Sequence, residues 1–291
     1  MNNKVPLEQS VLLICVKYGG DEETERYLES LRAQESFHAL HVLVVDNSAD
    51  SKWMPNVPEL NCQAVRRPAN LGYLGGARYG LSAYLEQNVM PDWVIISNVD
   101  LILSGTQFLM HLSKLASLSD LGAVAPSICS DLTGIDQNPY MKTRPSKLRM
   151  HAYKWLYRNW LVLNMHELGA AVFHRLQTAP VGSRKSPDQS VRCSQQTIYA
   201  PHGSMIILSR QYFERGGDLN FPEFLFGEEI YIAEKVRSLG LKVVYEPRLK
   251  VIHEEHHSTK LLKSRKIAAY AAASAAYCAD AFFPLRPQRS R

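Results

Sequence analysis

The chain has 291 residues, of which 46% are hydrophobic and 21% are charged, an ordinary composition for a globular protein that can bury a core. Its five cysteines are widely spaced and contain no C-x-x-C pair, which argues against a disulfide framework or a zinc site. No apolar run approaches the roughly 18 residues that cross a bilayer, and the start of the chain lacks the apolar segment of a signal peptide. We therefore expect a soluble or peripheral protein in a reducing compartment.

The formal net charge is only +5, but the charge is unevenly distributed. Residues 137–166 contain six Lys or Arg and no acid, and Asp280 is the only acid after Glu255. Segments of one sign interact with surfaces of the opposite sign. These two segments are therefore predicted to be attracted to anionic surfaces.

The first two apolar runs, residues 10–16 and 41–45, flank a helical pattern at about 21–34. A strand, a helix and a second strand in this order predict a βαβ unit and a parallel sheet. Ligands of such sheets bind beyond the carboxyl ends of the strands, which is where Asp46 follows the second run. Asp46 could accept hydrogen bonds from a base or a ribose, or it could only close the strand with an Asx turn.

A glycine-rich loop at residues 70–80 precedes the next helical pattern. Gly72, Gly75 and Gly76 would allow phosphates to approach the backbone at the start of that helix. A dinucleotide-binding fingerprint would place the loop directly after an apolar strand, whereas the polar sequence 66–69 precedes it here. The loop alone is therefore a weak signal for a Rossmann nucleotide site.

Two polar residues, Asn98 and Asp100, follow the third apolar run at residues 93–97. Alternate residues of an extended segment point the same way, so both side chains could face one site. A hard divalent cation bound to a diphosphate takes oxygen ligands, usually only one or two of them from protein. The pair could hold such a cation, or it could form a strand-ending turn.

The alternation continues with a helix at 106–118 and a strand at 123–125, and it ends near residue 131. The region that follows contains a basic amphipathic helix, residues 147–163, whose two faces are distinct. The basic face comprises Lys147, His151, Lys154 and Arg158, and the apolar face comprises Leu148, Ala152, Leu156, Trp160 and Leu163. This pattern is typical of a helix that lies on a membrane surface, although a solvated helix packed on its own domain shows it too.

Residues 199–257 form one continuous unit in the sequence. A strand at 205–208, a helix that ends at Gly240 and a strand at 242–245 are predicted, followed by a segment that contains His253. Glu228 and Glu229 open the helix after an aromatic loop. Paired acids can abstract a proton, or they can simply complement the helix dipole. An alanine-rich helix at 260–283 follows this unit.

The order of these signals resembles the family 2 glycosyltransferases, most closely the bacterial branch that builds O-antigen, capsule and related polysaccharides. The resemblance covers about residues 10–257, apart from an insertion at 131–195. It is carried by Asp46-Asn47-Ser48, Asn70-x-Gly72-x-x-Gly75-Gly76, Asn98-x-Asp100, the segment from Gly203 to Arg210, Gly216-Gly217, Phe226-Gly-Glu228-Glu229 and Val251-Ile-His253.

The family implies an α/β protein with the GT-A fold, in which helices flank a mostly parallel central sheet. A Rossmann-like nucleotide-sugar half (about 10–126) and an acceptor half (about 196–257) would form one catalytic domain, residues 1–257. The basic insertion (about 131–195) would interrupt this domain, and residues 258–291 would be a helical tail.

The resemblance also implies a role for each matching residue. The metal, Mg²⁺ or Mn²⁺, would be held by Asp100 and His253, and the base would be Glu229 or, failing that, Glu228. The donor would be contacted by Asp46 at its nucleoside and by Asn70, Gly72, Gly75, Gly76 and Asn98.

The expected reaction is an inverting, metal-dependent transfer from a nucleotide-sugar to a hydroxyl of a glycan or lipid-linked glycan. The protein is expected in the cytoplasm, on the anionic inner face of the cell membrane. No nucleic-acid partner is expected. Two alternatives stay open: a catalytically inactive partner subunit with the same fold, and a nucleotidyltransferase that makes the activated sugar.

Overall fold

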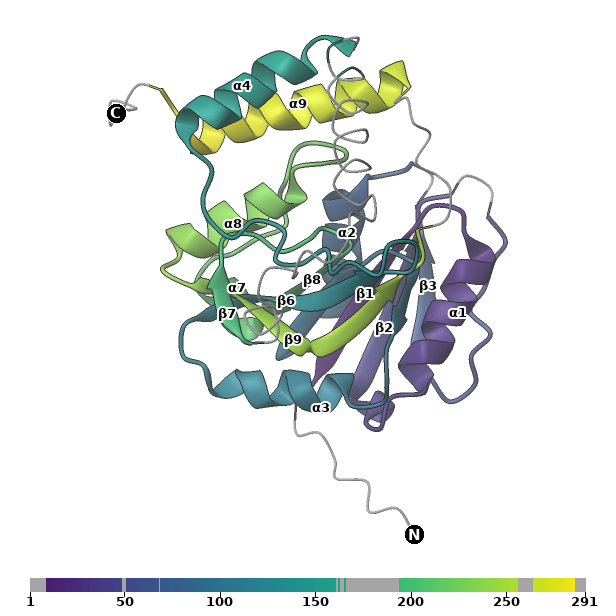
Figure 1. Ribbon diagram of the computed structural model, residues 1–291. Helices are drawn as coiled ribbons and strands as arrows, with labels where there is room; N and C mark the ends of the chain where they lie inside the picture. The colour runs from purple at the N-terminus through teal and green to yellow at the C-terminus, as the bar shows by residue number, and fades with distance from the viewer. Residues whose placement is uncertain are drawn as a thin grey trace, which may run out of the picture.

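The computed structural model describes residues 9–48, 51–67, 69–160, 162, 165, 194–255 and 264–285. Within these residues nine strands form one sheet in the order β3-β2-β1-β4-β8-β6-β9-β5, and β7 pairs with β9 (Figure 1). The strands are β1 (Val11–Lys17), β2 (Leu40–Asp46), β3 (Cys62–Arg66), β4 (Trp93–Ser97), β5 (Leu101–Leu103), β6 (Leu121–Ser130), β7 (Gln196–Ile198), β8 (Met205–Ser209) and β9 (Lys242–His253).

The first half of the sheet confirms the predicted βαβ unit. Strands β3, β2, β1 and β4 are parallel, and the helix α1 (Asp21–Arg32) connects β1 to β2. Alternate residues of β1 belong to two different cores: Leu12 and Ile14 face one side of the sheet, and Leu13 and Cys15 face the other. A parallel strand that is covered on both sides reads as a continuous apolar run, which is why β1, β2 and β4 are visible in the sequence.

The second half of the sheet is mixed. Strand β8 is antiparallel to both β4 and β6, while β9 runs parallel to β6 and antiparallel to β5. The register of the last pair joins Leu101 to His253. Because Asp100 directly precedes Leu101, this register brings it to the end of β9, beside His253.

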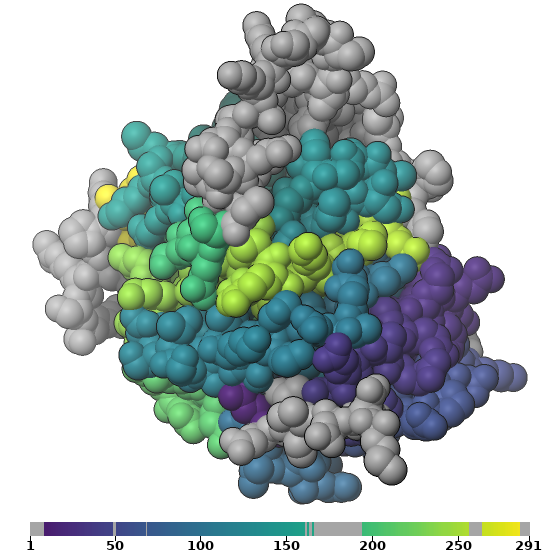
Figure 2. All heavy atoms as spheres, turned by 60° about the horizontal axis from the view of Figure 1, so that its bottom comes forward, coloured from purple at the N-terminus to yellow at the C-terminus, as the bar shows by residue number. Residues whose placement is uncertain are grey.

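Helices cover both faces of the sheet. The core that contains α1 also includes α3 (Phe108–Ser113), and Figure 2 shows the blue-teal segment of α3 next to the yellow-green β9. The opposite core includes α2 (Tyr73–Leu85), α7 (Arg210–Glu214) and α8 (Glu228–Ser238). A further layer of α4 (Lys147–Tyr157) and α9 (Arg265–Phe282) lies side by side above α8 (Figure 1).

Several predicted boundaries were wrong, and the causes are physical. Strand β3 was not predicted because it is a short edge strand of mixed polarity, CQAVR, that is only partly buried. Strand β9 is longer than the expected 242–245, and the helix expected at 106–118 is α3 followed by the 3-10 helix Lys114–Ser117. The segment 98–100 bends rather than extends, so alternation does not fix its side chains.

The helix α4 confirms a helix at this place, and it packs on its own domain, one of the two alternatives that the sequence left open. His151 Nε2 lies 3.0 Å from the carbonyl oxygen of Phe283, and Lys154 Nζ lies 2.7 Å from the Asp280 carboxylate, so two of the four basic-face residues contact α9. The carboxyl end of α9 attracts cations because its last carbonyls carry partial negative charge. On the predicted apolar face Leu148 is 77% exposed, and the neighbouring Trp155 is 70% exposed. Leu163, residues 166–193 and residues 256–263 lie outside the described residues.

Candidate active site

A cluster of charged side chains lies at the carboxyl ends of β1, β2 and β3. Asp46 is fully buried, and Lys17 Nζ lies 3.2 Å from its Oδ2 while the Ser48 N–H donates to its Oδ1 at 3.0 Å. Burial alone would raise the pKa of Asp46, but hydrogen bonds from Ser51 and Ser48 and the charge of Lys17 outweigh it and lower the pKa. The carboxylate is therefore ionised and already satisfied by protein groups.

Arg66, at the end of β3, adds an unsatisfied donor to this cluster. Its Nε lies 3.8 Å from Asp46 Oδ2, too far for a hydrogen bond, and its Nε and Nη2 are buried without a partner. Buried guanidinium donors without partners are costly, so they indicate a place where a ligand oxygen would bind. The sequence analysis did not identify Arg66 or Lys17 because β3 was missed and because the lysine ends an apolar strand.

The glycine-rich loop packs tightly against protein. Gly72 has a φ of +74°, and a Cβ there would lie 2.1 Å from the backbone oxygen of Phe224. A Cβ at Gly76 would lie 3.1 Å from Val16, and Asn70 Oδ1 accepts a hydrogen bond from the Gly72 N–H. The close approach that the glycines permit here is to β1 and to the loop before α8. At Gly75 a Cβ would lie 3.3 Å from Leu71, a residue of the same glycine-rich loop.

Asp100 and His253 meet as the strand register requires. His253 Nε2 lies 3.4 Å from Asp100 Oδ2, and its Nδ1 lies 2.8 Å from Gln137 Oε1. Gln137 Nε2 donates to Glu255, so its Oε1 faces the ring and Nδ1 must be the donor. In the neutral ring this leaves the lone pair on Nε2, which points toward Asp100.

These residues fit a divalent cation. Asp100 Oδ1 is buried without a hydrogen-bond partner, and His253 Nε2, which would offer a lone pair to a cation once deprotonated, lies 3.4 Å from the other oxygen of the same carboxylate. In the part of the chain that the structure describes, no group of three or more His, Cys, Asp or Glu could hold a metal. Two protein ligands suit a cation that takes its remaining ligands from a diphosphate and water. Among the described residues, no hydrogen bond or ion pair joins the Asn98 side chain to Asp100 or His253.

The acid pair opens α8 as predicted. Gly227 takes the left-handed conformation with φ +82°, and the preceding Phe226 has φ +70°, so the chain turns sharply into the helix. Glu228 is 5% exposed, whereas Glu229 keeps partial exposure. Burial, and then the charge of Glu229, raise the pKa of Glu228 to about 8, and burial also raises the pKa of Glu229.

The raised pKa of Glu228 predicts a pH-dependent stability. The folded chain keeps a proton that an unfolded glutamate, with a pKa of about 4.3, has released. The free energy of unfolding must then fall as the pH rises between these two pKa values, up to about 8. Glu228→Gln carries no such proton, so its stability should not fall in this way. We expect the melting temperature of Glu228→Gln minus that of wild type, measured by calorimetry, to increase from pH 5 to pH 8. A constant difference would show that Glu228 titrates at its ordinary pKa.

The segment 202–204 connects these groups. The ring of His202 lies 6.0 Å from that of His253, the Gly203 N–H donates to the Glu229 carboxylate, and the Ser204 carbonyl accepts from the Asn98 N–H at 2.9 Å. A Cβ at position 203 would lie 2.6 Å from Glu229 Oε1. Three consecutive residues thus tie the acid pair, the Asp100 and His253 pair, and the end of β4 into one site.

A cavity of about 410 Å³ lies beside the acid pair, between α4, the start of α8 and α9. Glu229 lines it and Glu228 does not. The other lining residues are Tyr140, Met141, Arg149, Met150, Tyr153, Tyr157, Phe226, Gly227, Ile230, Ala271, Ser274, Ala275 and Cys278. A group bound in this cavity could therefore reach the Glu229 carboxylate.

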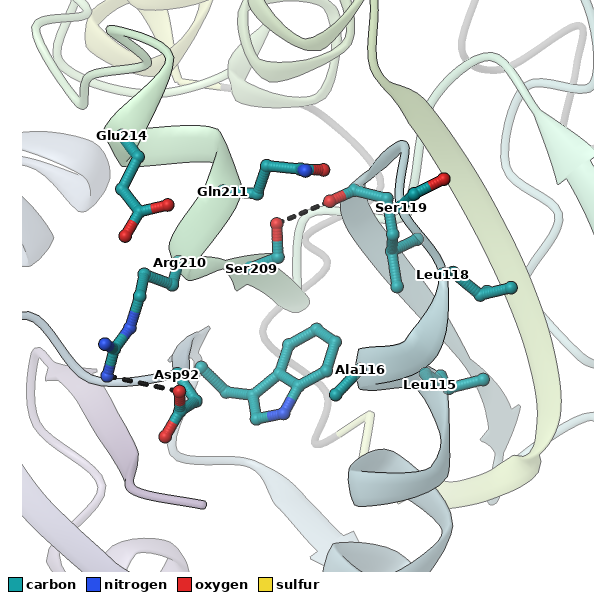
Figure 3. A pocket seen from close by; sticks show the side chains of 11 residues that line it. Asp92, Leu115, Ala116, Leu118, Ser119, Ser209, Arg210, Gln211 and Glu214 are labelled. Atoms are coloured by element: carbon teal, nitrogen blue, oxygen red, sulfur yellow. Dashed lines mark hydrogen bonds and ion pairs between the residues drawn. The ribbon is translucent and has the colours of Figure 1, made fainter.

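A second cavity, of about 220 Å³, lies at the amino end of β4. Figure 3 shows Arg210 joined to Asp92 by an ion pair, 3.1 Å long, at its edge. The Arg210 N–H also donates to the Asp92 carbonyl at 2.8 Å. Arg210 belongs to the motif that carried the family resemblance, yet it anchors α7 to the start of β4, away from the acid pair.

Known proteins resemble this chain in sequence and in fold. No protein family model matches the sequence. The chain is 25% identical over 282 residues to the N-acetylglucosaminyl-diphospho-decaprenol L-rhamnosyltransferase of Mycobacterium tuberculosis, an alignment that covers 92% of this chain and 83% of the relative.

Two solved structures share the fold. A Pyrobaculum calidifontis mannosyltransferase with GDP-Man and Mn²⁺ matches 87% of this chain with a TM-score of 0.52 and 18% identity. GalNAc-T7 with UDP, GalNAc and Mn²⁺ matches 86% of this chain with a TM-score of 0.53 and 12% identity. The matches cover 60% and 44% of those two chains. The chain is a GT-A glycosyltransferase. The fold and the family 2 resemblance predicted from the sequence are thereby confirmed.

The structure adds three residues to the candidate site of this glycosyltransferase that the sequence analysis did not single out: Lys17, Arg66 and Gln137. It also gives a contact to Gly203, which belongs to a motif that carried the family resemblance. Lys17 and Arg66 neighbour Asp46, Gln137 orients His253, and Gly203 holds Glu229. Gln137 lies in a region without a clear pattern and 116 residues from its partner, so no local signal could have found it.

Proposed function

We propose that this glycosyltransferase transfers a sugar, with inversion, from a nucleotide-sugar to a hydroxyl of a growing lipid-linked glycan of a bacterial surface polysaccharide. The observation that carries the proposal is the segment 202–204, because it places a carboxylate with a raised pKa and a metal-fitting pair in one site. The rhamnosyltransferase relative, by its name, acts on a diphospho-decaprenol-linked sugar. Both structural neighbours carry a nucleotide or nucleotide-sugar and Mn²⁺.

The donor would lie across the carboxyl ends of β1, β2 and β4. Arg66 would give its free donors to the nucleoside or a phosphate, with the Asp46 carboxylate near its guanidinium and Lys17 paired to that carboxylate. Asn70, Gly72, Gly75, Gly76 and Asn98 would shape the neighbouring wall. Asp100 and His253 would hold Mg²⁺ or Mn²⁺, which when bound neutralises negative charge on the leaving diphosphate.

Glu229 would act as the general base. The acceptor oxygen attacks the anomeric carbon, the bond to the nucleoside diphosphate breaks, and the electron pair leaves with the diphosphate. The proton of the acceptor hydroxyl passes to the Glu229 carboxylate, which lines the cavity and whose pKa is raised toward the operating pH. Glu228 is buried beside it and would stay protonated.

The domain division follows from this assignment. Residues 10–126 would form the nucleotide-sugar half and 196–257 the acceptor half of one catalytic domain, residues 1–257. In the tail, 258–291, α9 would complete the acceptor side because it packs against α4 and α8.

The nucleotide-sugar proposal is tested by thermal stabilisation. A ligand that binds the folded state raises the melting temperature by mass action. Nucleotide-sugars with different bases and sugars, the activated form of rhamnose among them, are each added with and without Mn²⁺. We expect one donor class to stabilise the protein more with the cation than without it. No stabilisation by any donor would contradict the proposal.

Gly203→Ala should inactivate the enzyme without unfolding it. The added methyl group would occupy space 2.6 Å from Glu229 Oε1, and the carboxylate can move away because it ends a flexible side chain. We expect an unchanged melting temperature and a loss of transfer of about 10²-fold, comparable to a misplaced base. Val89→Ala is the control, since the Val89 side chain is 81% exposed and lies in none of the groups described above. Equal activity of the two variants would show that Gly203 does not position Glu229.

The exposed side of α4 is proposed to rest on an anionic membrane surface, which would place the protein on the inner face of the cell membrane. No helix among the described residues has the length and apolarity to span a bilayer. Lys147, Leu148, Trp155 and Arg158 are exposed, whereas Lys154 is paired with Asp280. The exposed cations supply charge attraction, and Leu148 and Trp155 supply apolar contact that salt does not screen.

Changing Lys147 and Arg158 to Glu should weaken binding to phosphatidylglycerol vesicles. Each basic residue contributes about 1 kcal/mol, so the two account for roughly 30-fold in cosedimentation affinity at low salt. The control changes Arg32 and Lys114 to Glu, which alters charge equally on α1 and at the end of α3, over the opposite core. Equal binding by both variants would contradict the membrane contact of α4.

A further inference from the structure

The cavity beside Glu229 has walls of a distinct chemistry. Its volume, about 410 Å³, lies within the range of roughly 300–1,000 Å³ that is typical of small-molecule sites. Four aromatic side chains line it: Tyr140, Tyr153, Tyr157 and Phe226. Aromatic faces with hydroxyl groups at their edges provide apolar contact and hydrogen bonds together, which suits a sugar ring.

One wall is hollow because α9 presents small residues there. Ala271, Ser274, Ala275 and Cys278 all line the cavity. Their spacing of three, four and seven residues places them on one face of the helix. On the same helix Ala273 is exposed and does not line the cavity. The sequence of α9 therefore leaves space where larger side chains would have filled the contact with α8.

Arg149 is the cation among the lining residues. Its Nη2 donates to Tyr153 Oη at 2.9 Å, and its guanidinium lies 5.4 Å from the centre of that ring. The Tyr153 ring in turn stacks on Tyr157 at 5.8 Å. The aromatic wall thus fixes a guanidinium that has further N–H donors to offer, the geometry that binds phosphate oxygens.

We propose that this cavity binds the reacting sugar of the acceptor and that Arg149 binds the phosphate attached to that sugar. The inference rests on the proposed function and narrows its acceptor to a sugar carrying a phosphate or diphosphate. Three observations support it: Glu229 at the cavity, aromatic walls, and a cation held on one wall. The donor cluster at Asp46 and Arg66 belongs to the ends of β2 and β3, which leaves this cavity for the second substrate.

Filling the cavity tests the sugar site. Ala275→Phe places a ring in the hollow, and Ala273→Phe is the matched control on the exposed face of α9. The probes are a short-chain alkyl diphosphate of N-acetylglucosamine as acceptor and the donor found by thermal stabilisation. We expect Ala275→Phe to lower transfer at subsaturating acceptor at least tenfold, while donor stabilisation and donor hydrolysis without acceptor stay unchanged. Equal transfer by Ala275→Phe and Ala273→Phe would overturn the inference.

Removing the guanidinium tests the phosphate contact. We expect Arg149→Ala to raise KM for the diphosphate acceptor about ten- to a hundredfold, as for a lost charged hydrogen bond, with little change in kcat. Arg149→Lys should restore part of the affinity, and Arg32→Ala, an exposed helical arginine with a local partner, should match wild type. An alkyl N-acetylglucosaminide without the diphosphate should be used equally by wild type and Arg149→Ala.

The outcomes separate this inference from the proposed function. If wild type transfers sugar but Arg149→Ala still prefers the diphosphate acceptor to the alkyl N-acetylglucosaminide as strongly as wild type does, the phosphate assignment is wrong and the proposed function stands. If wild type neither binds a nucleotide-sugar nor transfers, the proposed function fails, and the acceptor assignment fails with it.

Discussion

Asp100→Ala is expected to lower transfer by about 10³-fold or more and to abolish the effect of Mn²⁺ on donor binding. A metal that neutralises a leaving diphosphate contributes several kcal/mol to the transition state, and about 4 kcal/mol corresponds to this factor. The structure motivates the choice, because Asp100 Oδ1 is buried without a partner and Oδ2 faces His253 at 3.4 Å. Removal of the carboxylate leaves one protein ligand.

The measurement compares turnover and donor-induced stabilisation across a Mn²⁺ series. Asn98→Ala is the comparison, and we expect a smaller loss because the Asn98 side chain carries no charge. Its backbone N–H, which bonds to Ser204, is unchanged by the substitution. Wild-type turnover of Asp100→Ala at limiting metal would show that the cation, if one binds, is held elsewhere.

Glu229→Gln is expected to lower kcat by about 10²–10⁴-fold while donor affinity stays near the wild-type value. The amide keeps the shape of the side chain and still accepts from the Gly203 N–H, but it cannot take a proton. Glu229 rather than Glu228 is chosen because Glu229 lines the cavity. Glu228 is almost fully buried, with 5% exposure.

Glu228→Gln separates the two members of the pair. If Glu228 is protonated during turnover, the neutral amide of Glu228→Gln resembles it, and activity should fall by less than tenfold. This loss is at least an order of magnitude smaller than the loss expected for Glu229→Gln. Single-turnover rates with saturating donor give the comparison. A larger loss from Glu228→Gln than from Glu229→Gln would exchange their roles.

The parts of the fold that the sequence predicted are those with a strong local pattern. Strands β1, β2 and β4 are buried on both faces and read as apolar runs, and α8 carries acids at its start and a glycine at its end. The order of short motifs then indicated the GT-A fold, although each motif alone was ambiguous. Strand β3 was not predicted because an edge strand need not be apolar.

The candidate site was only partly predictable, because contacts between distant segments fix its geometry. Asp100 meets His253 through the β5 and β9 register, and Gln137 reaches the same ring from a region without periodicity. The partners of α4 could not be predicted, since an isolated helical wheel cannot show that the carboxyl end of α9 attracts His151 and Lys154. Contacts of this kind depend on the whole fold.

The most direct test of the central claim is mass spectrometry of the reaction product, together with NMR of its anomeric configuration. Purified protein is incubated with Mn²⁺, a nucleotide-sugar that stabilises it, and the alkyl diphosphate of N-acetylglucosamine. We predict an acceptor heavier by one sugar, with the anomeric configuration inverted relative to the donor, formed by wild type and reduced at least a hundredfold in Glu229→Gln. The account would be contradicted if no donor that stabilises the protein gave a heavier product. It would also be contradicted if Glu229→Gln gave the same yield of product as wild type.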